Sequence, residues 1–79
     1  MTYPYLDTLP LTDAQKQTIT EAGYENAPTL YLICKAIPTA MKQVLGVDSL
    51  DELEKALWDT LTPEERTAVE AELDELKKL

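Results

Sequence analysis

Hydrophobic residues repeat at helical spacing along most of this chain. The clearest stripe occupies positions i, i+3, i+4 and i+7 and consists of Leu30, Ile33, Cys34 and Ile37. A second stripe continues from it at i, i+4, i+7 and i+8, with Ile37, Met41, Val44 and Leu45. No segment combines the strict alternation of a half-buried strand with flanking turn signals. The pattern predicts an all-α fold, and we expect these stripes to face its core.

Local signals predict the ends of the first helix. Thr12 and Gln15 have the spacing of a capping box, in which each residue's side chain accepts a hydrogen bond from the other's backbone N–H. The helix that follows should run to about Ala22. Gly23 comes next, and glycine readily adopts the left-handed conformation that closes a helix.

Proline and glycine divide the next segment into two helices. Asn26 can cap a second helix, because its side-chain oxygen accepts from a free N–H of the first turn. That helix should end or kink near Ala36, since Pro38 has no N–H to donate and its ring clashes with the preceding turn. A short third helix should begin there and end at Gly46.

Two further capping boxes occur in the C-terminal half. Ser49 and Glu52 form one, which predicts a fourth helix whose buried face consists of Leu50, Leu53 and Leu57. Thr62 and Glu65 form the other, with Pro63 at the first helical position. The helix that follows should be the longest, from about Pro63 to Lys78, with Val69, Leu73 and Leu76 on one face.

These elements predict a single domain over residues 1–79, a compact bundle of about five short helices. The first four should form two hairpin-like pairs, and the longer C-terminal helix should close the bundle. Residues 1–11 contain two prolines and no helical period, so we expect an extended N-terminal arm before a helical region over residues 12–79.

A short internal repeat supports the prediction of two helix pairs. The segments 14–19 and 40–45 are similar, and each is followed by a glycine, a few polar residues and another helix. Over about residues 12–58 the chain resembles tandem helix-hairpin-helix and SAM-like small helical domains, most clearly in segment 45–53. A DNA-binding hairpin of that kind has glycines in its turn, which bring backbone amides close to a phosphate. The corresponding turn here, residues 37–40, has none. The resemblance therefore implies the fold without the DNA binding.

Composition narrows the possible functions. The chain has 15 acidic and 7 basic residues, for a net charge of −8, so it offers no cationic patch for direct nucleic-acid binding. It lacks histidine, the commonest general base near neutral pH, and its single cysteine cannot form an internal disulfide. Cys34 lies on the apolar stripe and should be a core residue. We therefore expect a protein that is not an enzyme, with no cofactor and no metal site.

The acidic residues are unevenly distributed. Residues 48–79 hold eleven acids and four bases, a net charge of −7, whereas residues 1–47 have a net charge of −1. Carboxylates near helix starts, such as Asp48, Asp51 and Glu52, are explained by the helix dipole and by capping. Four others lie away from any helix start and are candidates for partner binding: Glu70, Glu72, Asp74 and Glu75. The alternative is that these acids only solvate a helix face.

Three aromatic residues complete the candidate site. Tyr24 is one, and Tyr31 and Trp58 each follow a predicted core leucine and should lie at the edge of the buried face. Aromatic residues in such positions are common in protein–protein hot spots. The favoured function is therefore an acidic protein–protein interaction module, a small adaptor or inhibitor whose partner has a basic surface. The alternatives are a DNA mimic and a structural subunit of a phage or bacterial assembly.

Three features suggest the location of the protein. No stretch is long and apolar enough to span a membrane, and the first residues lack the cationic region and apolar run of a signal peptide. Together with the free thiol, these features predict a cytoplasmic protein without membrane contact.

Overall fold

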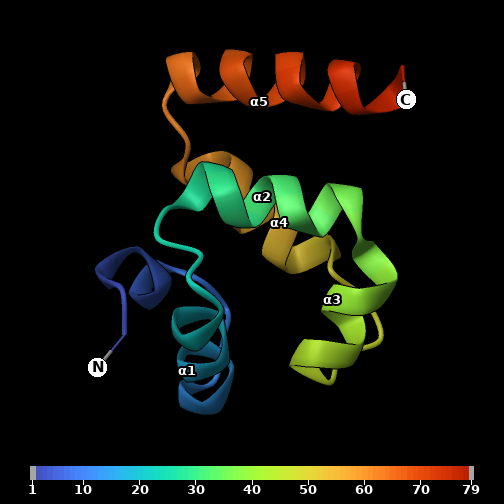
Figure 1. The fold of residues 1–79 in the computed structure, drawn as a ribbon. Coiled ribbons are helices and arrows are strands. Elements are labelled where there is room, and N and C mark those ends of the chain that lie inside the picture. The colour runs from blue at the N-terminus through green and yellow to red at the C-terminus, as the bar shows by residue number, and fades with distance from the viewer. Residues whose placement is uncertain (1, 79) are drawn as a thin grey trace.

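The computed structural model describes residues 2–78, which form a short 3₁₀ helix and five α-helices (Figure 1). No β-strand occurs among these residues, so the prediction of an all-α fold is confirmed. The elements in chain order are η1 (Pro4–Thr8), α1 (Asp13–Ala22), α2 (Ala27–Ala36), α3 (Pro38–Leu45), α4 (Asp51–Thr60) and α5 (Pro63–Lys77).

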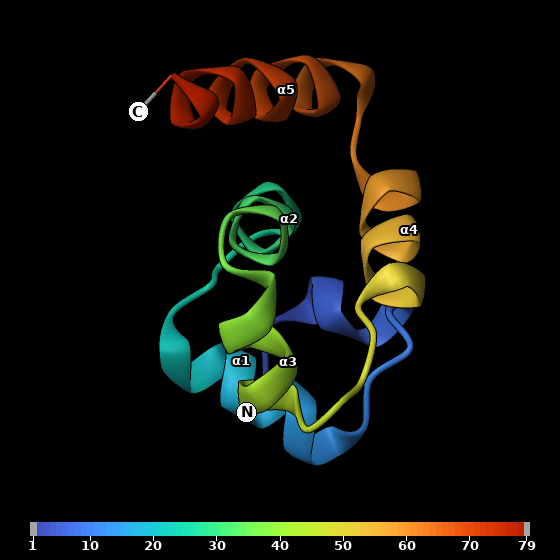
Figure 2. The same ribbon diagram turned by 90° about the vertical axis from the view of Figure 1, so that its right-hand side faces the viewer.

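Helix α2 is the centre of the packing. It contacts α3, α4 and α5, whereas α1 packs against α3 (Figure 1). Seen along its axis, α2 has α5 above it, α4 to one side and α3 below (Figure 2). The α2 residues Leu30 and Cys34 are fully buried. The sequence of α2 is the most apolar of the five helices, which suits an element that three others contact.

Most predicted helix ends are confirmed at atomic detail. Both bonds of the capping box form at Thr12 with Gln15 and at Thr62 with Glu65. The Asn26 side chain accepts from the N–H of the third residue of α2, at 3.0 Å. Helices α1 and α3 end at glycines in the left-handed conformation, as predicted.

The capping box predicted at Ser49 and Glu52 does not form. The Ser49 hydroxyl accepts from the N–H of Asp51, at 3.2 Å, and α4 begins at Asp51. Leu50 is therefore not a residue of α4, but its side chain is still buried. The helix starts one residue later than the box requires, and the short serine side chain bonds the nearer amide.

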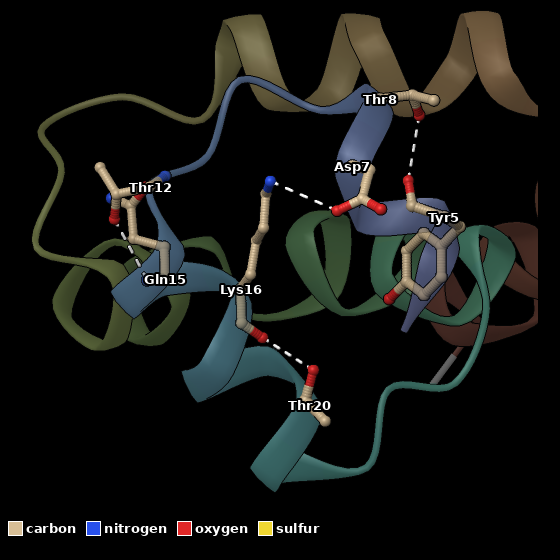
Figure 3. Close-up of polar contacts among 7 residues, drawn as sticks. All are labelled: Tyr5, Asp7, Thr8, Thr12, Gln15, Lys16 and Thr20. Carbon is tan, nitrogen blue, oxygen red and sulfur yellow. Dashed lines mark hydrogen bonds and ion pairs between the residues drawn. The ribbon is translucent and has the colours of Figure 1, made fainter. Parts of the chain in front are cut away.

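The N-terminal arm is not extended throughout, because residues 4–8 form the 3₁₀ helix η1. Leu6 of this short helix reaches the core, where it is fully buried. Figure 3 shows that Lys16 of α1 extends toward Asp7, and the Nζ–Oδ1 distance of 3.4 Å makes this an ion pair. The arm thus covers the helices, which explains its apolar side chains.

Three residues of the predicted buried stripes are instead exposed: Ile37 by 46%, Val44 by 52% and Leu76 by 45%. Ile37 occupies the junction between α2 and α3 with a non-helical backbone, so the stripe does not run straight through it. Ile33 of α2 is only partly buried. Met41 and Leu45 of α3, which belong to the second stripe, are buried as predicted. The helix axis breaks between α2 and α3, so the apolar faces of these two helices do not form the one continuous stripe that the sequence pattern predicts.

Candidate interaction site

Tyr31 and Trp58 lie side by side, although they come from different helices. Their ring centroids are 5.5 Å apart and the planes are tilted by 40°, a common aromatic pairing geometry. Each ring follows a fully buried leucine, Leu30 on α2 and Leu57 on α4, so the α2–α4 core contact brings the aromatic neighbours together. Tyr31 is 9% exposed, and Trp58 is half-buried.

An ion pair joins the same two helices beside the rings. The Lys35 Nζ lies 3.1 Å from the Glu54 Oε2 and 5.6 Å from the centroid of the Tyr31 ring. The hydrogen bond to Glu54 is the main reason that the pKa of Lys35 is raised. Lys35 follows Tyr31 by one helical turn and Glu54 precedes Trp58 by one turn, so each helix presents one aromatic and one charged residue.

Arg66 connects this cluster to α5. Its Nε donates to the Trp58 carbonyl oxygen at 3.0 Å, and its guanidinium carbon lies 5.3 Å from the centroid of the Trp58 ring. Trp58 is therefore held by contacts from both α2 and α5. An anchor held in this way loses little conformational freedom when a partner binds.

A shallow hollow of about 310 Å³ opens at the aromatic pair. Its lining combines the two rings with two carboxylates and two ammonium groups: Tyr31, Lys35, Asp51, Glu54, Lys55 and Trp58. Because Lys35 and Glu54 neutralise each other, the charges left to face a partner are those of Asp51 and Lys55. The hollow can hold one apolar or aromatic side chain, with polar contacts around its edge.

Tyr24 does not belong to this hollow. It lies in the loop between α1 and α2, where its carbonyl oxygen accepts a hydrogen bond from the Tyr5 hydroxyl at 2.6 Å. Burial is the main cause that raises the pKa of Tyr5 to about 12. This contact fastens η1 to the loop through the main chain of Tyr24.

The four acidic candidates on α5 are all exposed, but they do not form one patch. At about 100° per residue, Glu70 and Asp74 share one edge of the helix. Glu72 and Glu75 share another edge, and Glu75 pairs with Lys78 at 3.5 Å. Among the described residues, no ion pair or hydrogen bond connects these four carboxylates to the aromatic pair. None of the four acidic candidates lines the hollow at Tyr31 and Trp58.

Cys34 is fully buried, as predicted. Burial is the main cause that raises the pKa of its thiol to about 12, and the nearby Glu54 carboxylate adds to the effect. The thiol is thus protonated at neutral pH, and a protonated thiol is a poor nucleophile and a poor metal ligand.

Within residues 2–78, no group of three or more Asp, Glu, Cys or His side chains is arranged to hold a metal ion. No helix in this range is both long enough and apolar enough to cross a bilayer.

Sequence reasoning identified Tyr31 and Trp58 but missed Lys35, Glu54 and Arg66. The one-turn spacing of an aromatic and a charged residue is visible on both α2 and α4. It does not show that the two helices face each other at this point, and nothing in the sequence places Arg66 over an indole ring.

Comparison with known proteins gives no relative for this chain: no family model, curated protein or solved structure matches it. The resemblance to helix-hairpin-helix and SAM-like domains therefore stays a prediction.

Proposed function

We propose that this chain is a non-enzymatic protein-interaction module that binds a partner with a basic surface through the hollow at Tyr31 and Trp58. The observation that supports the proposal most strongly is the aromatic pair itself, which is partly open to solvent and held by three helices. Tryptophan and tyrosine in such partly closed sites contribute a large share of the binding energy in many interfaces.

The charge of the molecule supports the choice of partner. The net charge of −8 produces a negative field that speeds the approach of a positively charged protein and slows that of an acidic one. In this proposal the carboxylates of α5 act by steering, because they are exposed and none of them lines the hollow. Contact and steering are thus performed by different parts of the chain.

The test is a comparative pull-down with quantitative mass spectrometry. The baits are the wild-type chain, Trp58→Ala, Asp51→Lys and the matched control Glu64→Lys. Asp51 and Glu64 are both exposed acids in the first turn of a helix, so both changes alter the net charge and the helix dipole equally. Only Asp51 lines the hollow.

We expect a basic protein that the wild type and Glu64→Lys retain and that Trp58→Ala and Asp51→Lys lose. Circular dichroism of each bait confirms that it is folded. Equal recovery by all four baits would refute the proposal. Loss with Glu64→Lys as well, together with competition by DNA, would instead favour the DNA mimic, because that function depends on total charge.

A further inference from the structure

The outer face of α4 forms a ridge between two hollows. At about 100° per residue, Lys55 points directly away from the core residues Leu53 and Leu57. On one side of it lies the aromatic hollow, and on the other a wider one of about 500 Å³ between α4 and the N-terminal segment. Lys55 lines both hollows.

The wider hollow is acidic. Its charged lining residues are Asp7, Glu52, Lys55 and Asp59. Asp7 is paired with Lys16, whereas no ion pair within the described residues involves Glu52 or Asp59. Both are exposed, and together they leave this side of α4 with more negative than positive charge. Carboxylates in this arrangement favour arginine or lysine side chains from a partner.

We propose that the outer face of α4 is a docking surface for one basic, amphipathic segment of a partner protein, which crosses Lys55 and occupies both hollows. An apolar side chain of the segment enters the hollow at Tyr31 and Trp58. Its cationic side chains reach Glu52 and Asp59 in the wider hollow. The inference rests on the proposed function and specifies the chemistry and the path of the partner.

Lys55 makes the proposal testable, because it is a cation in the middle of a surface that should attract cations. Its replacement by glutamate removes a repulsive contact and adds an attractive one, so Lys55→Glu should bind more tightly. Lys77→Glu makes the same change in net charge on α5, outside both hollows. A second matched pair is Glu52→Lys/Asp59→Lys on α4 and Glu70→Lys/Asp74→Lys on α5.

The probe is a synthetic peptide of about 14 residues, or four helical turns, with leucine at helical spacing among lysine and arginine. The control peptide has glutamate in place of every cation. Neither peptide contains tryptophan, so Trp58, the only tryptophan of the chain, reports occupancy of the aromatic hollow by its fluorescence. The titrations are performed in 0.15 M salt, where the screening length is about 8 Å and net charge acts weakly at a distance.

We expect a saturable change in Trp58 fluorescence with the basic peptide and none with the acidic one. Lys55→Glu should bind about three- to tenfold more tightly, and Glu52→Lys/Asp59→Lys about tenfold more weakly, as is typical of exposed charge contacts. Lys77→Glu should stay within about twofold of the wild type, whereas Glu70→Lys/Asp74→Lys, which removes only steering charge, should weaken binding by less than the α4 pair does.

Equal effects of the α4 and α5 variants would show that the peptide follows net charge alone and would overturn the docking path. The proposed function would survive that result if the pull-down partner still depended on Asp51 and Trp58. The proposed function would be refuted only if recovery of the partner in the pull-down also did not depend on Asp51 and Trp58.

Discussion

The helical stripe on α2 offers a sharp test of the packing, because the sequence pattern treats its residues as equivalent and the structure does not. Leu30 is fully buried, whereas Ile37 is 46% exposed at the junction with α3. Replacement of either residue by alanine removes three carbon atoms. The two variants therefore differ in burial and hardly at all in the chemistry removed.

The expected magnitudes follow from burial. Leu30→Ala removes fully buried carbons on the helix that three others contact, and such changes cost about 2–5 kcal/mol including the cavity they leave. Ile37→Ala removes carbons that keep about half of their contact with water. At about 0.8 kcal/mol for each fully buried CH₂ group, the cost is about 1 kcal/mol. A domain of this size has a free energy of unfolding of roughly 4–12 kcal/mol, so Leu30→Ala could remove most of it.

The assay is urea unfolding of the wild type and both variants, followed by far-UV circular dichroism. We expect the urea midpoint to fall sharply for Leu30→Ala and slightly for Ile37→Ala. The slope m, the change in unfolding free energy per molar urea, should be the same in all three proteins. Equal losses of stability in the two variants would refute this reasoning. They would mean that α2 and α3 form one continuous buried face, as the sequence pattern suggests, with no break at Ile37.

Further predictions concern caps, buried protons and charge. Thr62→Ala should cost about 1 kcal/mol in the same urea assay, because it leaves an N–H of the first turn of α5 without its acceptor. Cys34 should react slowly with a disulfide reagent in the folded protein and quickly in urea. The folded pKa values of Cys34 and Tyr5 are both about 12, above the ordinary values of 9.0 and 10.0, so the unfolded chain loses these protons first. Stability should therefore fall as the pH rises from about 9 toward 12, which urea midpoints at pH 7 and pH 10 will show. No DNA binding should be measurable by fluorescence anisotropy at physiological salt, because phosphate repels a chain with a net charge of −8. With the partner from the pull-down, surface plasmon resonance should show slower association and unchanged dissociation after charge reversal of Glu70, Glu72, Asp74 and Glu75.

The amino-acid sequence by itself determined the all-α class and most helix ends. Helix ends depend on signals that act over three or four residues: the capping boxes, Pro38, and the glycines after α1 and α3. Their effects can therefore be predicted without the rest of the fold. The exception at Ser49 shows the limit of this reasoning. Two nearby amides compete for one short hydroxyl, and spacing alone does not decide between them.

The tertiary structure decided which faces are buried. A stripe of apolar residues predicts burial only while the helix axis is straight, and the axis breaks between α2 and α3. Leu76, near the end of α5, is 45% exposed, although the sequence pattern places it on the same face as the buried Val69. The central position of α2 likewise results from packing among segments far apart in the chain.

The candidate site shows the same division. Its two aromatic residues were predictable because each follows a core leucine, but their pairing depends on how α2 and α4 meet. Arg66 and the ion pair of Lys35 with Glu54 came only from the structure, since side chains 19 residues apart in sequence become neighbours through packing. The acids of α5 were grouped by their closeness in sequence, and the helix places them on two edges. Local hydrogen bonding is encoded within a few residues, whereas a binding surface is assembled from several helices.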